Sequence, residues 1–361
     1  MNRIFRLIAT LVALAPLSGS VALAGVSYSE RSDRVVDVRG LTALDVNNAS
    51  GLVQLRPSPD GRLHVTAVKV CRARDRALAT RLCGETSVET GAVGSRFDIR
   101  VRYPRRIDVH VDFWELFHSH GDDTGFWPHL EVQLLLEVPA NLALHVQTSS
   151  GDIQSEGMSG TQRLYSSSGD VTVHRSSGPL TVETSSGDLA VEQVVASRLR
   201  SSSGDIGVKD AGALDASTVS GDLSVQGARD SLVLNTTSGD IVVQDAPHGI
   251  DGHTISGQLR VRGSCGHVTL GSQSGDVRAR VRGPLLAADV ESVSGEVGLE
   301  LAQGMDASLE LGSSSGDLDC QAPVRLLQHD RNSLSAQYGR GGPRVRLRTS
   351  SGDIHVTSGG R

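Results

Sequence analysis

A Ser-Gly dipeptide followed by an acid or an amide recurs along the chain, and it constrains the fold more than any other feature. Eleven copies occur at intervals of 17 to 21 residues, apart from a final interval of 36. Because 36 residues are two periods, we expect one degenerate turn near Leu334. A fixed period of this length is typical of proteins whose units stack on their neighbours. The predicted turn residues are Gly151, Asp152, Gly169, Asp170, Gly187, Asp188, Gly204, Asp205, Gly221, Asp222, Gly239, Asp240, Gly275, Asp276, Gly316, Asp317, Gly352 and Asp353.

The positions around each glycine alternate in character. The third residue before it is always Ser or Thr, the fifth before is nearly always aliphatic, and the second after is Ile, Val or Leu. Side chains alternate across a strand, so these positions share the inner face of two strands that meet at the glycine. One unit cannot bury its apolar face alone, so the units should stack as parallel strands. The sequence predicts an all-β fold, a single-stranded parallel β-solenoid (β-helix) of about 18-residue rungs.

The polar positions of the repeat suggest how the turns are held. We expect the glycine to adopt a bend conformation or a close approach that a Cβ would penalise. The inward Ser and Thr hydroxyls should form ladders along the stack. The stacked acids either accept hydrogen bonds from turn amides and nearby hydroxyls, or bind calcium. We favour the first because the repeat lacks the glycine-aspartate nonapeptide of calcium-binding β-helices, and we predict no cofactor.

The first residues have the features of a secretory signal peptide. Arg3 and Arg6 precede a short apolar run, and an Ala-x-Ala pattern ends at Ala24. The rest of the chain has no apolar run long enough for a transmembrane helix. We therefore expect export to the periplasm, the cell surface or the extracellular space. Loss of the two arginines changes the net charge from −6 to −8, which argues against nucleic acid as a partner.

The four cysteines can persist as disulfides in an exported protein. Cys71 and Cys83 flank a short Arg- and Ala-rich stretch, and we predict that they form a disulfide. Cys320 falls in the inward apolar column, whereas Cys265 follows Val261 in a connection. Counting rungs along the chain places these two about 14 Å apart, too far for a bond.

The region before the repeats is less regular. Residues 41–55 carry one copy of the repeat phase, with Gly51 at the turn, and this copy could form an opening rung. Strand-like stretches follow at 63–70, 97–101 and 130–138. A solenoid needs its open end covered, so this region is interpreted as an irregular N-terminal cap. The expected organisation is a signal peptide at 1–24, a strand-rich flanking or capping region at 25–129 and the solenoid at 130–361.

The stretch from residue 110 to residue 129 differs from its surroundings by its rings and histidines. Three hypotheses remain open for it: a cap that plugs the solenoid end, a recognition loop, and a metal site. The candidate binding residues are Phe113, Trp114, Phe117, Phe126 and Trp127. The candidate metal ligands are His110, His118, His120 and His129.

The segment Leu136-Glu137-Val138-Pro139, leading into Leu144, Val146 and Ser150-Gly151-Asp152, has a recognisable pattern that the later repeats continue. This pattern resembles the bacterial putative-adhesin families of exported β-solenoids, including the domain called toastrack. The resemblance covers residues 130–361 well and residues 41–55 weakly. It implies a single-stranded solenoid in the cell envelope and no particular reaction.

An enzyme of the polysaccharide-cleaving β-helix type is the main rival class. Such an enzyme usually presents aromatic faces to sugar rings, but no aromatic residue lies between Tyr165 and Tyr338. We find no nucleophile elbow, phosphate loop or Cys-x-x-Cys motif. The sequence therefore predicts a non-enzymatic, adhesin-like binding or scaffold protein of the cell envelope, with an envelope protein or wall polymer as partner. The alternatives are a polysaccharide-active β-helix enzyme and a calcium-binding repeat protein.

Overall fold

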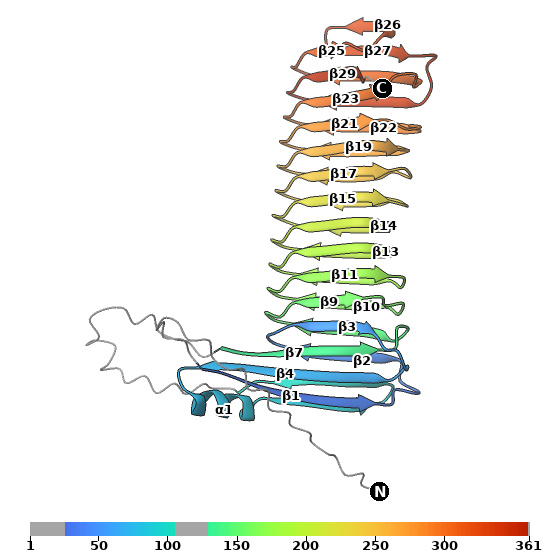
Figure 1. Cartoon of the computed structure of the whole chain (residues 1–361). Helices are drawn as coiled ribbons and strands as arrows, with labels where there is room; N and C mark the ends of the chain where they lie inside the picture. Colours follow the sequence, from blue (N-terminus) through green and yellow to red (C-terminus); the bar gives the residue numbers. More distant parts are fainter. Residues whose placement is uncertain (1–25, 105–128, 360–361) are drawn as a thin grey trace, which may run out of the picture. The chain divides into compact units, whose positions relative to one another are not determined.

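The computed structural model describes residues 26–104 and 129–359, which are nearly all β-strand with one helix. The described residues form two compact units that divide between Ser155 and Glu156. Figure 1 shows the strands of the second unit as successive rungs of a stack. The predicted signal peptide at 1–24 lies outside the described residues.

Each rung of the second unit has two strands that meet at a Ser-Gly corner, which is followed by Asp except at Gln258 and Glu296. The leading strands, which precede the corner, are β10 (Gln162–Ser166), β12 (Leu180–Thr184), β16 (Leu232–Asn235), β18 (Ile250–Thr254), β20 (His267–Ser272) and β22 (Ala287–Ser292). The trailing strands, which follow it, are β11 (Val171–Ser176), β15 (Leu223–Ala228), β17 (Ile241–Ala246), β19 (Leu259–Cys265), β21 (Val277–Val281) and β23 (Val297–Ala302). Two longer strands supply a trailing and then a leading segment, β13 (Leu189–Ser201) and β14 (Ile206–Ser217).

Neighbouring rungs pair in parallel, and the register advances by one repeat at each step. Val191, Val208, Val225, Val243 and Val261 are successive partners along the trailing strands. Each of these side chains is at most 2% exposed, as the alternating pattern requires. The predicted all-β parallel solenoid is therefore confirmed.

The corner glycines are needed because successive rungs approach closely. An ideal Cβ placed on Gly239 would lie 1.8 Å from the carbonyl oxygen of Gly221, and the other corners of the second unit repeat this geometry. None of the corner glycines described in this unit has a positive φ. Of the two explanations for the glycine, the close approach is the correct one.

A second column of residues, whose backbone conformation is constrained, lies six residues after the corner glycines from Gly151 to Gly257. Its members have φ between 51° and 108°, in the left-handed region that favours glycine. The alternating pattern did not predict this column, because the residue type varies along it. The members in the second unit are Gly157, Arg175, Gln193, Asp210, Gly227, Asp245 and Gly263.

The order of rungs at the C-terminal end departs from chain order. The last elements are β24 (Ala307–Ser313), β25 (Leu318–Cys320), β26 (Val324–Asp330), β27 (Ser333–Tyr338), β28 (Arg344–Thr349) and β29 (Ile354–Gly359). Strand β28 pairs with both β22 and β24, and β29 pairs with both β23 and β25. The rung of Gly352 therefore lies between the rungs of Gly295 and Gly316 (Figure 1).

Hydrogen bonds at the corners follow the same intercalated order. The Thr349 hydroxyl donates to the Gly295 carbonyl at 3.2 Å, and the Ser313 hydroxyl donates to the Gly352 carbonyl at 3.0 Å. The prediction of a degenerate turn near Leu334 was wrong. Leu334 belongs to β27, which runs antiparallel to β24 and β26, so the long interval holds a hairpin and not a rung.

The two unpaired cysteines are placed differently from the sequence-based prediction. Cys265 is fully buried in β19, where an irregularity in the pairing with β17 turns it into the inward column beside Ala246. Cys320 is only half-buried, because β25 pairs with β29 alone in the described chain. Both are free thiols, and they are separated by four rungs instead of three.

The first unit contains the predicted opening rung and additional antiparallel strands. β2 (Ala43–Asn48) pairs with β8 (Ala143–Thr148), and β3 (Val53–Pro57) pairs with β9 (Ile153–Glu156), all in parallel. Further outward, β2 pairs with β6 (Arg96–Arg102), which pairs with β5 (Ser87–Val93). On the other side β3 pairs with β7 (His129–Val138), followed by β4 (Leu63–Ala73) and β1 (Val26–Val36).

A disulfide joins the end of β4 to the helix α1 (Arg76–Glu85). Cys71 and Cys83 are bonded, with Cα atoms 5.9 Å apart, as the sequence predicts. Asp75 caps the helix by accepting a hydrogen bond from the Leu78 amide at 2.8 Å. The disulfide packs against a small buried cluster that includes Leu82.

The turn of the opening rung is held by an aromatic residue. Asn48 occupies the position of the usual Ser or Thr and donates to the Val132 carbonyl at 2.8 Å. The Tyr103 hydroxyl lies 2.6 Å from Asn48 Oδ1 and 2.5 Å from the Ser50 carbonyl oxygen. Burial raises the pKa of Tyr103 to about 12, so the phenol stays protonated and can donate.

Candidate functional site

The Ser and Thr column holds the corners through the backbone. The Gly239 amide donates to the Thr236 hydroxyl at 3.1 Å, and that hydroxyl donates to the Gly221 carbonyl at 3.3 Å. The expected ladders exist, but the hydroxyls bond the backbone of the corner glycines instead of another hydroxyl, and several of them, such as Thr218 and Thr254, bridge two glycines. This difference follows from the close approach of the corners, which brings a carbonyl oxygen into reach.

The aspartate column is also held by backbone amides. The amide of Asp240 donates to Asp222 Oδ1 at 2.8 Å, and the amide of Asp222 donates to Asp205 Oδ1 at 2.8 Å. These bonds offset the repulsion of stacked carboxylates, as the favoured interpretation requires. In residues 26–104 and 129–359, no group of three or more His, Cys, Asp or Glu side chains is arranged to hold a metal ion.

Most of the candidate residues in the aromatic segment lie outside the described residues. These are Phe113, Trp114, Phe117, Phe126, Trp127, His110, His118 and His120. His129 begins β7 and is exposed, with its Nε2 atom 3.4 Å from Glu131 Oε2. The segment connects β6 to β7, and its three proposed roles stay predictions.

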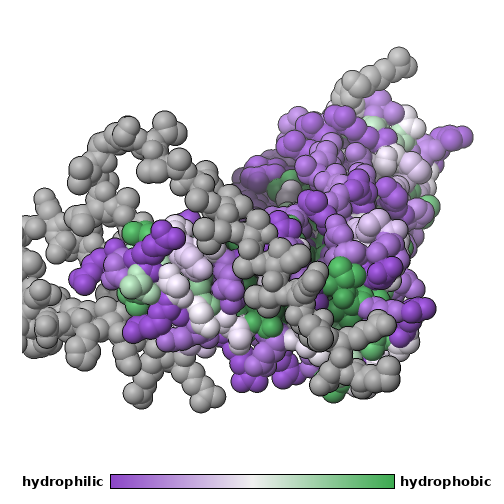
Figure 2. Space-filling model, turned by 60° about the horizontal axis from the view of Figure 1, so that its bottom comes forward, coloured by the Kyte–Doolittle hydropathy of each residue, from purple (hydrophilic) through white to green (hydrophobic). Residues whose placement is uncertain are grey.

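One face of the described chain is mainly polar. Figure 2 shows hydrophilic residues over most of the visible face, with smaller hydrophobic areas between them. None of the helices in the described ranges has both the length and the apolar character needed to cross a membrane. The outer strands carry hollows and charged groups that are candidate sites.

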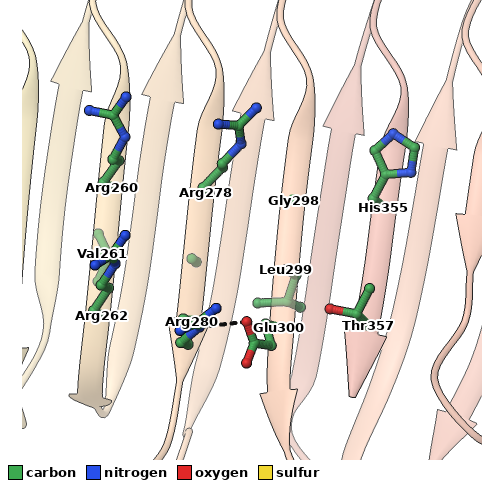
Figure 3. A pocket seen from close by; sticks show the side chains of 11 residues that line it. Arg260, Val261, Arg262, Arg278, Arg280, Gly298, Leu299, Glu300, His355 and Thr357 are labelled. Carbon is green, nitrogen blue, oxygen red and sulfur yellow. Dashed lines mark hydrogen bonds and ion pairs between the residues drawn. The ribbon is translucent and has the colours of Figure 1, made fainter. Parts of the chain in front are cut away.

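Four arginines form a compact array on the trailing face, defined as the outward side chains of the trailing strands. Arg260 and Arg262 project from β19, and Arg278 and Arg280 project from β21 (Figure 3). The register places Arg260 opposite Arg278 and Arg262 opposite Arg280. Like charges that are directly opposite each other destabilise a sheet, so this arginine array needs compensating negative charge.

Acids at the corner compensate one row of the arginine array. Arg260 lies 3.3 Å from an Asp240 carboxylate oxygen. Arg278 lies 3.3 Å from Asp276 and 3.5 Å from Glu296. These pairs hold the two guanidinium groups near the corner, and because they are partly exposed each contributes little to stability.

The other row is only partly compensated. Arg280 pairs with Glu300 of β23, as the dashed line in Figure 3 marks. Arg262 faces the neutral Gln244 on one side and Arg280 on the other. In the described chain no acidic group lies within ion-pair distance of Arg262, which leaves its guanidinium available to a ligand.

A hollow of about 250 Å³ adjoins the arginine array. It exists because Gly298 has no side chain, while its partners in the register are Arg278 on one side and His355 on the other. Figure 3 shows this gap between the two basic side chains. His355 Nδ1 is 3.5 Å from Asp319 Oδ2, and Thr357 also lines the hollow.

A larger and shallower hollow of about 870 Å³ lies along the leading strands near the corner. Gly271 and Gly312 open it, and its charged groups are of both signs. Other lining residues include Asn235, His253, Glu291, Asn332 and Arg348. This leading hollow lacks the opposed like charges that single out the trailing face.

The sequence motifs that predict the corners do not predict the arginine array, although the sequence contains a signal for it. Arg260 and Arg278 are one 18-residue period apart, and so are Arg262 and Arg280. Outward positions that repeat a charge at one period become neighbours in the stack. The hollow has a similar signal, since Gly298 stands where most other rungs have a side chain.

A family model described as Toastrack DUF4097 matches residues 128–263 and 250–357 of the chain. The chain belongs to this toastrack family. The resemblance predicted from the corner motifs is therefore confirmed. No curated protein matches the toastrack chain significantly.

Three solved structures are similar to the toastrack chain at low identity. A putative cell adhesion protein from Clostridium sporogenes is 8% identical, with a TM-score of 0.26, and the match covers 92% of this chain and 100% of that one. A putative adhesin from Bacteroides fragilis is 10% identical, with a TM-score of 0.21 and coverages of 90% and 96%. A putative adhesin from Parabacteroides distasonis is 10% identical, with a TM-score of 0.24 and coverages of 93% and 98%.

Proposed function

We propose that the chain is a non-enzymatic, adhesin-like binding protein of the bacterial cell envelope, and that its trailing face carries the binding surface. The observation that carries the proposal is the arginine array. Arg262 and Arg280 lie directly opposite each other with only Glu300 to compensate them, and Arg262 has no acidic partner among the described residues. Guanidinium groups remain protonated, so they suit binding of anions and not proton transfer.

Two further features support an envelope location. The Cys71–Cys83 disulfide is of the kind that persists in oxidising compartments outside the cytoplasm. The predicted signal peptide would direct the chain there. Membership of the toastrack family, which resembles exported solenoids, is consistent with both.

Sedimentation of the purified chain with isolated envelope fractions tests the proposal. The double variant Arg262→Ser/Arg280→Ser removes two charges from the trailing face. The control Arg198→Ser/Arg200→Ser removes two exposed charges from the leading face of β13. Loss of one charge-assisted contact of about 1.4 kcal/mol should weaken retention of the trailing variant about tenfold.

Wild type and the leading-face control should be retained equally. If wild type is not retained, or if both variants are retained as wild type is, the trailing face is not the binding surface and the proposal fails. Melting temperatures of the variants identify any loss that comes from unfolding.

A further inference from the structure

We infer that the ligand of the trailing face is an acidic polysaccharide that runs along the stack and seats one acidic group over Gly298. This inference rests on the proposed function and names the ligand class of the same surface.

The groups that would hold the polysaccharide lie in one row across successive strands. Arg260, Arg278, Gly298 and His355 are partners in the register of β19, β21, β23 and β29. With strands about 4.8 Å apart, the Cα atoms of Arg278 and His355 are about 10 Å apart across the hollow. A carboxylate or sulfate fits this width and can accept hydrogen bonds from a guanidinium group on one side and an imidazole on the other.

A second row, parallel to the first, contains both charged and neutral groups. Arg262, Arg280, Glu300 and Thr357 follow one another along the same strands. The Arg280–Glu300 pair and the Thr357 hydroxyl supply donors and acceptors beside the hollow. This mixture suits a polymer that carries hydroxyl groups between its acidic groups, as an acidic polysaccharide does.

The composition of the solenoid favours a polysaccharide over single-stranded nucleic acid. Proteins that bind single strands stack the bases on aromatic side chains. No aromatic residue occurs between Tyr165 and Tyr338, and the trailing strands with the arginine array lie within this interval, so bases have no ring to stack on. Sugar rings have none either, so the acidic groups and hydroxyls of the polysaccharide, and not its rings, would make the contacts.

Filling the hollow gives a sharp test because Gly298 can take a side chain. An ideal Cβ there would be 3.5 Å from Arg278 Cγ, which is ordinary contact, and threonine suits a strand. Gly298→Thr should therefore fold normally while it blocks the seat. Gly207→Thr is the matched control, since Gly207 holds the equivalent position in β14 and its nearest atom, the Leu189 carbonyl oxygen, is 3.9 Å away.

Calorimetric titration of the full chain would use polygalacturonate as a carboxylate probe and heparin as a sulfate probe, with neutral dextran and oligothymidylate as controls. Wild type and Gly207→Thr should bind at least one acidic glycan equally, and the stronger probe identifies the acidic group. Gly298→Thr and Arg278→Ser should bind at least about tenfold more weakly. Dextran should not bind, and added salt should weaken binding.

Three outcomes would overturn the inference. The first is wild type that binds neither acidic glycan, and the second is Gly298→Thr that binds as wild type does. The third is tighter binding of oligothymidylate than of either glycan. If neither glycan binds while retention by envelope fractions still depends on Arg262 and Arg280, the proposed function stands and only the ligand class is wrong.

Discussion

Replacing Gly239 with alanine should force the corner of its rung away from the preceding rung. An ideal Cβ on Gly239 would lie 1.8 Å from the carbonyl oxygen of Gly221 and 2.6 Å from its carbonyl carbon, whereas real Cβ contacts essentially never fall below 3.0 Å. The oxygen contact alone requires a shift of 1.2 Å, the difference between 3.0 and 1.8 Å. Both atoms are backbone, so no side-chain rotation relieves the clash.

The expected loss of stability follows from the hydrogen bonds that such a shift breaks. The Ser238 amide donates to the Val219 carbonyl at 2.9 Å, and the Asp240 amide donates to the Asp222 carboxylate at 2.8 Å. A neutral bond contributes about 1 kcal/mol and a bond to a charged group about 1.5–3 kcal/mol, so the variant should lose about 2.5–4 kcal/mol.

Urea denaturation followed by far-ultraviolet circular dichroism measures this loss. Gly207→Ala is the control, because an ideal Cβ on Gly207 meets only the Leu189 carbonyl oxygen at 3.9 Å. The control should match wild type or gain about 0.4–1 kcal/mol from a less flexible unfolded chain. Equal midpoints for Gly239→Ala and Gly207→Ala would refute the role assigned to the close approach.

Four other expectations can be checked with the same protein. Val225→Asp should lose several kcal/mol because Val225 is 2% exposed, whereas Asp at the exposed Ser224 should change stability by less than about 0.5 kcal/mol; equal melting temperatures would contradict the register. Gln193→Gly should gain about 0.5–1 kcal/mol by relieving a residue held at φ 55°, and a lower urea midpoint would argue against strain there. Burial raises the pKa of both free thiols, so alkylation should be slow at neutral pH and accelerate as the pH rises toward the raised pKa; in the native protein Cys320 should react before Cys265, and the reverse order would be inconsistent with their burial. Calcium titration should give neither heat nor a higher melting temperature, because the corner carboxylates already accept amide hydrogen bonds; clear stabilisation by calcium would show that the column binds the ion.

The fold could be predicted well wherever local alternation decides the structure. Val225 and its equivalents face inward because a one-residue shift of the strands would expose the whole column of apolar side chains. The repeat period then determines which residues pair between neighbouring rungs. The order of the last rungs could not be predicted in this way. The corners of Gly316 and Gly352 have the same local pattern, so either could stack on the rung of Gly295, and long-range packing decides between them.

The candidate site illustrates a different limit. The inward pattern draws attention to buried positions, while the arginine array lies on outward positions where residue type varies. That Arg260 lies opposite Arg278 becomes clear only when the register of β19 and β21 is known. The burial of Cys265 could not be predicted for a related reason. A one-residue irregularity beside Ala246 moves Cys265 into the inward column, and repeats of varying length give no sign of such a shift.

The intercalated rung of Gly352 has a consequence for how the chain reaches its final form. A stack that followed chain order could grow one rung at a time from either end. Here β28 and β29 must enter between strands that precede them in the chain, and β25 has no other partner in the described structure. In the native order the outermost rung, with its hairpin, pairs with the final strands and not with the rung of Gly295. The last residues therefore hold the C-terminal end of the stack in place. A chain shortened before Arg344 would lose β28 and β29, and with them the strands that pair with β24 and β25, so more than one rung would be affected.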